Sequence, residues 1–165
     1  MKKLLYSLPL VTLLSLSSCF LLSDETKAKQ SVKDKTFSET TDGYYYVGQE
    51  TYTITFYNDT YDSYYEHVNQ HREGGIAVED EKVSYEGETY KYLSSSKISW
   101  VGDWGARHSV TYHVFELSKH PRFGDTGYFI IENKSTVGYI DRSEPRTDKT
   151  NDFTDGERVI LQKGE

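Results

Sequence analysis

Residues 51–57, TYTITFY, alternate polar and apolar side chains over most of their length. Successive side chains of a β-strand point to opposite faces, so Tyr52, Ile54 and Phe56 share one face and the threonines share the other. β-Branched and aromatic residues of this kind fit a pleated, half-buried surface. The segment therefore predicts a strand of an antiparallel sheet that has one buried face.

Similar short runs recur along the chain, separated by turn-forming residues. We expect further strands at residues 44–47, 82–85, 89–93, 109–117, 127–132, 137–140 and 157–162. The glycine-containing stretch 86–88 predicts a hairpin turn between two of these runs, and 133–136 predicts another turn. Residues 142–156 are polar and predict a surface loop. A helix is compatible only with residues 62–72, where two adjacent tyrosines disfavour it.

Composition supports one β-rich domain. The length of 165 residues matches a single domain, and 36% hydrophobic with 15% aromatic residues can close one core, which excludes a wholly disordered chain. Fifteen tyrosines against one methionine favour strands. About eight short strands within residues 43–165 therefore predict an all-β domain, either an antiparallel β-sandwich or a small β-barrel. The sequence does not separate these two architectures.

The first 19 residues have the features of an exported bacterial chain. A pair of lysines precedes a largely apolar stretch, residues 4–16, that is too short to span a bilayer comfortably. The stretch leads into Leu16-Ser17-Ser18-Cys19, which contains the only cysteine. This motif resembles the lipobox of bacterial lipoproteins. The resemblance implies that residues 1–18 are a cleaved signal peptide, that the Cys19 thiol receives a diacylglyceryl group, and that the new amine is often acylated.

Lipidation of Cys19 would leave the mature chain without a thiol and therefore without a disulfide. Two acyl chains are enough for stable membrane attachment. Phe20 stands where family members retained in the inner membrane tend to have Asp. The resemblance thus implies the outer membrane of a Gram-negative host, or otherwise the outer face of the cell membrane. An ordinary cleaved signal peptide and an uncleaved anchor are the alternatives.

Residues 19–42 are expected to form the lipidated cysteine and a flexible tether. From residue 23 to 42 only Ala28, Val32 and Phe37 are apolar, and they follow neither a helical nor a strand period. About twenty flexible residues reach on the order of 25 Å, which would hold a domain clear of the lipid headgroups. A frayed helix over residues 25–35 is the alternative.

The charge balance limits the partners. The 19 Lys and Arg residues against 26 Asp and Glu give a formal charge of −7, and removal of residues 1–18 makes it two units more negative. Nucleic acid is excluded as an expected partner, because binding its phosphates requires a basic face. An acidic domain attracts basic proteins instead. The expected partners are therefore the membrane, through the lipid on Cys19, and a basic or other envelope protein.

Recognisable catalytic motifs are absent from the sequence. It contains no GxSxG, GxGxxG or P-loop pattern, and lipidation would consume its only thiol. The acidic run 79–81 is typical of a solvated turn. The oxygen-rich stretch 148–156 departs from the EF-hand pattern, because Phe153 occupies the third position of the loop and Gln162 the twelfth. We therefore expect no enzymatic activity and no cofactor.

The five histidines do not form a metal-binding pattern. His67 and His71 lack the HExxH arrangement and are expected to be solvated. His108, His113 and His120 are expected at the surface or in cross-strand positions. No metal site is predicted.

Residues 99–108, SWVGDWGARH, are the most unusual stretch of the chain. Trp100 and Trp104 lie four positions apart, with Asp103 between them and small residues around them. This composition predicts a loop that exposes indole rings, which are common binding anchors. The alternative is that one or both tryptophans plug an end of the β core.

These observations favour a lipid-anchored, non-enzymatic envelope protein whose acidic β domain binds another macromolecule, for example as an inhibitor, immunity or exclusion factor. In outline this is similar to the small lipoprotein lysozyme inhibitors, although no motif of theirs is matched. The alternative is a structural lipoprotein that scaffolds an envelope complex. A hydrolase with an unrecognised site is a third hypothesis.

Overall fold

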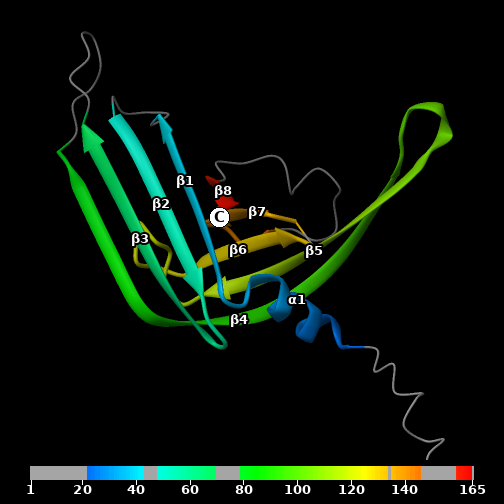
Figure 1. The fold of residues 1–165 in the computed structure, drawn as a ribbon, viewed down its shortest axis with the longest axis horizontal. Coiled ribbons are helices and arrows are strands. Elements are labelled where there is room, and N and C mark those ends of the chain that lie inside the picture. The colour runs from blue at the N-terminus through cyan, green and yellow to red at the C-terminus, as the bar shows by residue number, and fades with distance from the viewer. Residues whose placement is uncertain (1–21, 43–47, 70–78, 134, 146–158, 165) are drawn as a thin grey trace, which may run out of the picture.

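The computed structural model describes residues 22–42, 48–69, 79–133, 135–145 and 159–164, which form one short helix and a closed antiparallel β-barrel (Figure 1). Each strand pairs with its neighbour in sequence, and the last strand closes the barrel on the first. The elements are α1 (Asp24–Val32), β1 (Lys35–Asp42), β2 (Gly48–Phe56), β3 (Thr60–Asn69), β4 (Glu81–Val101), η1 (Asp103–Gly105), β5 (Arg107–Leu117), β6 (Gly127–Glu132), β7 (Val137–Asp141) and β8 (Val159–Lys163). The all-β prediction is confirmed, and of the two architectures the barrel is the correct one. No helix among the described residues is long and apolar enough to cross a membrane.

The alternation of residues 51–57 is realised in β2. Tyr52, Ile54 and Phe56 are buried in the barrel. The threonines on the other face pair with hydroxyl side chains of β1: Thr36 with Thr55 at 2.9 Å, Ser38 with Thr53 at 2.8 Å and Thr40 with Thr51 at 3.0 Å. One strand thus supplies the core with one face and a ladder of hydroxyl contacts with the other.

The expected flexible tether is wrong for residues 24–42, because they form α1 and β1. The Ser23 hydroxyl accepts a hydrogen bond from the Thr26 N–H and caps the helix. Ala28 and Val32, four positions apart, share one helix face and are fully buried. Phe37 lies in the barrel core on β1. The folded domain therefore begins at α1, not at residue 43.

Residues 62–69 do not form the helix that was compatible with residues 62–72, since Thr60–Asn69 form the strand β3. Its inward positions are Tyr61, Ser63, Tyr65 and His67, all buried, and they alternate with more exposed residues. His67 was expected to be solvated and is instead buried against Gly48, where a Cβ would lie 2.3 Å from its Nε2. The strand period therefore overrides the helical reading of this segment.

The hairpin predicted at residues 86–88 is also wrong, because β4 runs through it without turning back. Gly87 has a φ of 66° and donates its N–H to Asp62 Oδ1 at 2.8 Å, next to a register shift in the β3–β4 pairing. A glycine in this conformation makes a bulge that bends a strand. β4 consequently pairs with β3 as far as Thr89 and with β5 from Tyr90 to Val101.

Aromatic rings fill the barrel. Phe56 lies at its centre, with ring centroids 4.7 Å from Phe129 and 5.1 Å from Tyr90. The Phe129 ring in turn packs over Gly138, where a Cβ would lie only 2.3 Å from Cζ. Such packing leaves the interior as a solid core that holds the strands in place.

Candidate functional site

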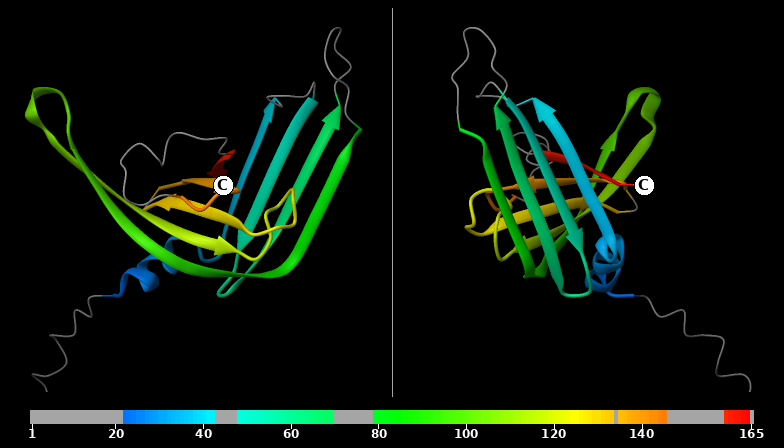
Figure 2. Two further views of the ribbon diagram at one scale, coloured as in Figure 1. Left: turned by 180° about the vertical axis from the view of Figure 1, so that it is seen from behind. Right: turned by 60° about the vertical axis from the view of Figure 1, so that its left-hand side comes forward.

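The β4–β5 hairpin is longer than the barrel to which it belongs. β6 pairs with β5 from Leu117 only as far as Tyr112, and β3 pairs with β4 only as far as Thr89. Among the described strands, residues 94–101 and 107–111 therefore have a strand neighbour on one side only. We call residues 94–111 the arm. Figures 1 and 2 show it projecting away from the barrel as a two-stranded ribbon.

The tip of the arm is a tight turn that presents Trp104 to solvent. The Gly102 N–H donates to the Ala106 carbonyl at 2.8 Å and closes the turn. Trp104 has a φ of 64°, a left-handed conformation that is unusual for a residue with a side chain. Its side chain is fully exposed, and that of Val101 is 68% exposed. For Trp104, the alternative of a core plug is therefore ruled out.

The other two predicted binding residues lie close to Trp104 in the chain. Trp100 is in β4, paired with His108 of β5, and Asp103 begins the turn η1. Their side chains are outside the described part of the structure. Residues 99–108 were expected to be a loop throughout, but the strands occupy both ends of that stretch.

The arm has two different faces, set by the strand register. One face continues the inner surface of the barrel and carries both basic side chains, with Lys97 opposite Thr111 and, near the tip, Arg107 opposite the apolar Val101. The other face continues the outer surface, where Ile98 lies opposite Val110. At the root of this outer face is a small apolar cluster. It comprises Val114 and Ile130, both buried, with Leu93, Ile98, Tyr112 and Tyr139 packed against them.

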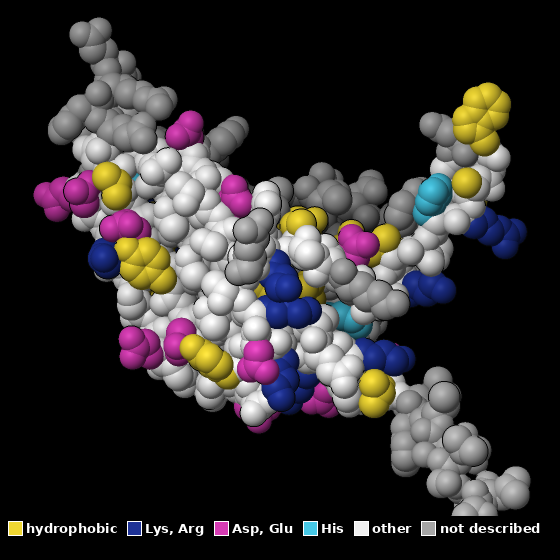
Figure 3. Space-filling model, viewed as in Figure 1, with side chains coloured by type: hydrophobic (Ala, Val, Ile, Leu, Met, Phe, Trp, Pro, Cys, Tyr) yellow, Lys and Arg dark blue, Asp and Glu magenta, His cyan; other side chains and the backbone are white. Residues whose placement is uncertain are grey.

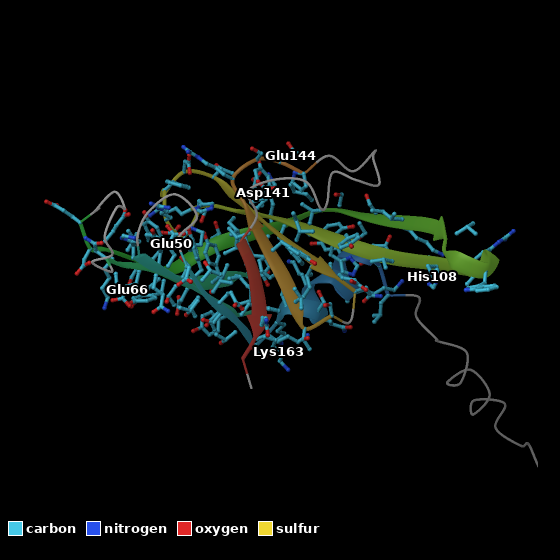
Figure 4. All side chains as sticks on the ribbon, turned by 90° about the horizontal axis from the view of Figure 1, so that it is seen from above. Glu50, Glu66, His108, Asp141, Glu144 and Lys163 are labelled. Atoms are coloured by element: carbon cyan, nitrogen blue, oxygen red, sulfur yellow. The ribbon has the colours of Figure 1, made fainter. Side chains whose placement is uncertain are left out.

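Charge is divided between the arm and the opposite side of the barrel. Lys97 and Arg107 are exposed on the arm, and Asp103 is the only acid from residue 93 to 115. In Figure 3, basic, His and hydrophobic side chains occupy the outer part of the arm, whereas Asp and Glu gather over the β2–β4 side. Figure 4 places His108 of the arm and Glu66 of β3 at opposite ends of the molecule.

The root of the arm is fixed by polar contacts. The Tyr92 hydroxyl donates to Ser95 Oγ at 2.9 Å, and Ser95 Oγ lies 2.7 Å from His113 Nδ1. His113 is cross-strand, as expected, but it is buried rather than at the surface, and burial lowers its pKa. α1 packs against β4 beside this root, and Asp24 of its first turn acts on His113 electrostatically. The root is thus held while the tip is exposed.

A second polar cluster closes the mouth of the barrel. Arg122, in the β5–β6 loop, forms an ion pair with Glu50 at 3.0 Å, and both side chains are less than a fifth exposed. The Tyr65 hydroxyl donates to the same Glu50 oxygen at 3.1 Å, and the Arg122 guanidinium lies over the Tyr65 ring. Burial, with the nearby Glu50 carboxylate, raises the pKa of Tyr52 to about 12. These contacts bind the loop to β2 and β3.

His120 organises the same β5–β6 loop. It was expected at the surface or in a cross-strand position, but it is buried in the loop, and its Nδ1 accepts a hydrogen bond from the Arg122 N–H at 3.1 Å. Burial lowers its pKa to about 4. A neutral imidazole packed in this way supports the loop as a structural element.

The remaining expectations fall partly outside the described residues. Cys19, His71 and the oxygen-rich stretch 148–156 are among the residues that the structure does not describe. Glu81 of the acidic run lies 3.7 Å from the Arg122 guanidinium. Within the described ranges, no three His, Cys, Asp or Glu side chains are placed to hold a metal ion together.

No protein-family model, curated protein or solved structure matches the chain. The candidate site therefore rests on the geometry alone. The sequence identified its tryptophans but not the arm that carries them. The signal for the arm is the length of the predicted strand 109–117, which is longer than the neighbouring predicted strands 89–93 and 127–132.

Proposed function

We propose that this protein is a lipid-anchored, non-enzymatic component of a bacterial envelope, and that its arm is the docking element for another envelope component. The observation that carries the proposal is Trp104, a fully exposed tryptophan at the end of a ribbon that projects from a closed barrel. Large aromatic side chains are the residues most enriched at binding hot spots. An exposed indole contributes nothing to the core, so its placement is explained by contact with something outside the domain.

The anchor follows from the lipobox resemblance of Leu16-Ser17-Ser18-Cys19. The corrected domain boundary changes what the anchor does. Because α1 begins at Asp24, the chain between a lipidated Cys19 and the folded domain is short. Five residue steps span at most about 18 Å. The domain would therefore sit close to the membrane instead of on a long stalk.

Thiol labelling tests both parts of the proposal, since Cys19 is the only cysteine. Mature wild-type protein should not react with a maleimide, because its thiol carries lipid. Ala106→Cys, at an exposed tip position that leaves Trp104 intact, should react rapidly in detergent-purified protein and slowly in the intact envelope, where the docked component covers it. Val68→Cys, at an exposed position on β3, is the matched control and should react equally in both. A reactive wild-type thiol contradicts the anchor, and equal labelling of Ala106→Cys in both preparations contradicts the docking role.

A further inference from the structure

The start of α1 and the arm lie on the same side of the barrel (Figures 1 and 2). α1 packs against β4, the strand that carries one side of the arm, and Asp24 and Lys27 of its first turn act electrostatically on the buried His113 at the root of the arm. A lipid on Cys19, at most about 18 Å of chain from Asp24, would hold this side of the molecule towards the bilayer. The arm would then extend beside the membrane that carries the anchor.

The chemistry of the arm fits a lipid interface. Tryptophan is enriched where headgroups meet acyl chains, because its ring is amphipathic. Trp104 and Val101 are the most exposed large hydrophobic residues described. Behind them Lys97 and Arg107 are exposed, and basic side chains near a surface are attracted to anionic headgroups. With Asp103 counted, the arm still has one net positive charge in a chain of −7.

The rest of the surface agrees with this orientation. Acidic side chains gather over the β2–β4 side, at the end of the molecule opposite the arm (Figures 3 and 4). Anionic lipids repel carboxylates, and in this orientation the carboxylates of the β2–β4 side face away from the membrane. A stable protein interface, by comparison, engages about 20–30 residues on each side. Among the side chains of the tip that the structure describes, the large exposed hydrophobic groups are the Trp104 indole and Val101, a small area that suits insertion into a lipid interface better than a protein contact.

We propose that the component docked by the arm is the lipid bilayer itself. Trp104 inserts at the boundary of headgroups and acyl chains, and Lys97 and Arg107 contact anionic headgroups. This inference rests on the proposed function and names the partner of the arm. Together with the lipid on Cys19, the inserted tip gives the domain two membrane contacts, which fix the orientation of the barrel and keep its acidic side facing away from the membrane.

Fluorescence of the purified lipoprotein, reconstituted in phosphatidylglycerol-containing vesicles, tests the inference. Trp100→Phe leaves Trp104 as the only tryptophan. Its emission should shift to shorter wavelength, and brominated lipid should quench it at least about threefold more than a tryptophan that stays in water. The control is Val68→Trp in a chain that also carries Trp100→Phe and Trp104→Phe. It should be quenched by aqueous acrylamide and not by brominated lipid.

Charge is tested by combining Lys97→Glu and Arg107→Glu in the Trp100→Phe chain. Quenching of Trp104 by brominated lipid should then fall about twofold or more, because both groups would be repelled by the anionic surface. The inference is overturned if Trp104 stays accessible to acrylamide in these vesicles. It is equally overturned if Trp104 becomes protected only in vesicles that retain the envelope proteins, since the arm would then dock to a protein. Mass spectrometry shows separately whether Cys19 carries lipid. If Cys19 carries none, the chain without lipid is added to the same vesicles, and the quenching of Trp104 fluorescence is measured and interpreted in the same way.

Discussion

The two halves of β4 belong to different environments. From Glu81 to Thr89 the strand pairs with β3 as part of the closed barrel, and from residue 94 to 101 it has β5 as its only described strand neighbour. In the barrel, aromatic rings are buried and charges are paired. On the arm, a tryptophan is fully exposed in a left-handed conformation. The barrel therefore carries the stability of the protein, and the arm is shaped for contact outside it.

The largest effect should come from Phe56→Ala in the barrel. Phe56 is fully buried among aromatic rings, and loss of such a ring costs about 3–5 kcal/mol of unfolding free energy. Trp104→Ala, which removes a larger ring from the arm, should change the unfolding free energy by less than about 0.5 kcal/mol. Urea denaturation of both variants measures the difference. Equal losses would mean that the arm is part of the stable core.

The next effect is a pH dependence confined to the barrel. Burial lowers the pKa of His120 to about 4 in the folded protein, whereas an unfolded histidine titrates near about 6.5. Above the unfolded pKa both states are neutral. As the pH falls from about 6.5 to 4 the unfolded state takes up the proton first, so stability is lost by up to about 3 kcal/mol. His120→Asn should flatten this part of the profile of stability against pH. An unchanged slope between wild type and variant would show that His120 is not buried as described.

A smaller loss should follow Arg122→Ala at the mouth of the barrel. The variant leaves Glu50, which is mostly buried, without its cation, at a cost on the order of 2 kcal/mol. The matched control is Arg142→Ala, because Arg142 and Asp125 form an exposed pair at 2.7 Å. Exposed pairs contribute less than about 1 kcal/mol. Thermal unfolding compares the stability of the two variants. A larger loss of stability for Arg142→Ala than for Arg122→Ala would contradict the stabilising role of the Arg122–Glu50 pair at the mouth of the barrel.

The smallest effect has the opposite sign. Trp104→Gly relieves a side chain held at a φ of 64°, so the protein should gain up to about 1 kcal/mol of stability. The same change removes the indole and should abolish protection of the tip by the membrane. Calorimetry and vesicle binding of this variant measure both outcomes. A loss of stability greater than about 1 kcal/mol would show that Trp104 supports the fold.

Local sequence predicted the strands that β-branched and aromatic residues mark along their own length, as in β2, β5, β6 and β7. It failed where distant residues decide the structure. The sequence around Gly87 is compatible with a hairpin turn and with a bulge. The bulge forms because the Asp62 carboxylate on β3 accepts a hydrogen bond from the Gly87 N–H. Helix α1 was expected only as the alternative to a flexible tether, because Ala28 and Val32 are the only apolar residues that mark its buried face. The sequence predicted exposed indole rings in residues 99–108 but not the ribbon that carries Trp104, because the ribbon results from β4 and β5 extending beyond their pairing with β3 and β6.

Hydrogen exchange of the backbone amides tests most directly whether the arm and the barrel are separate in role. In the purified protein, amides of residues 96–101 and 107–110 should exchange through local opening, much faster than those of β2 and β6. On phosphatidylglycerol-containing vesicles the arm amides should become protected, while those of β2 and β6 stay unchanged. The account is contradicted if the arm amides exchange as slowly as the barrel in the free protein, or if the vesicles leave their exchange unchanged.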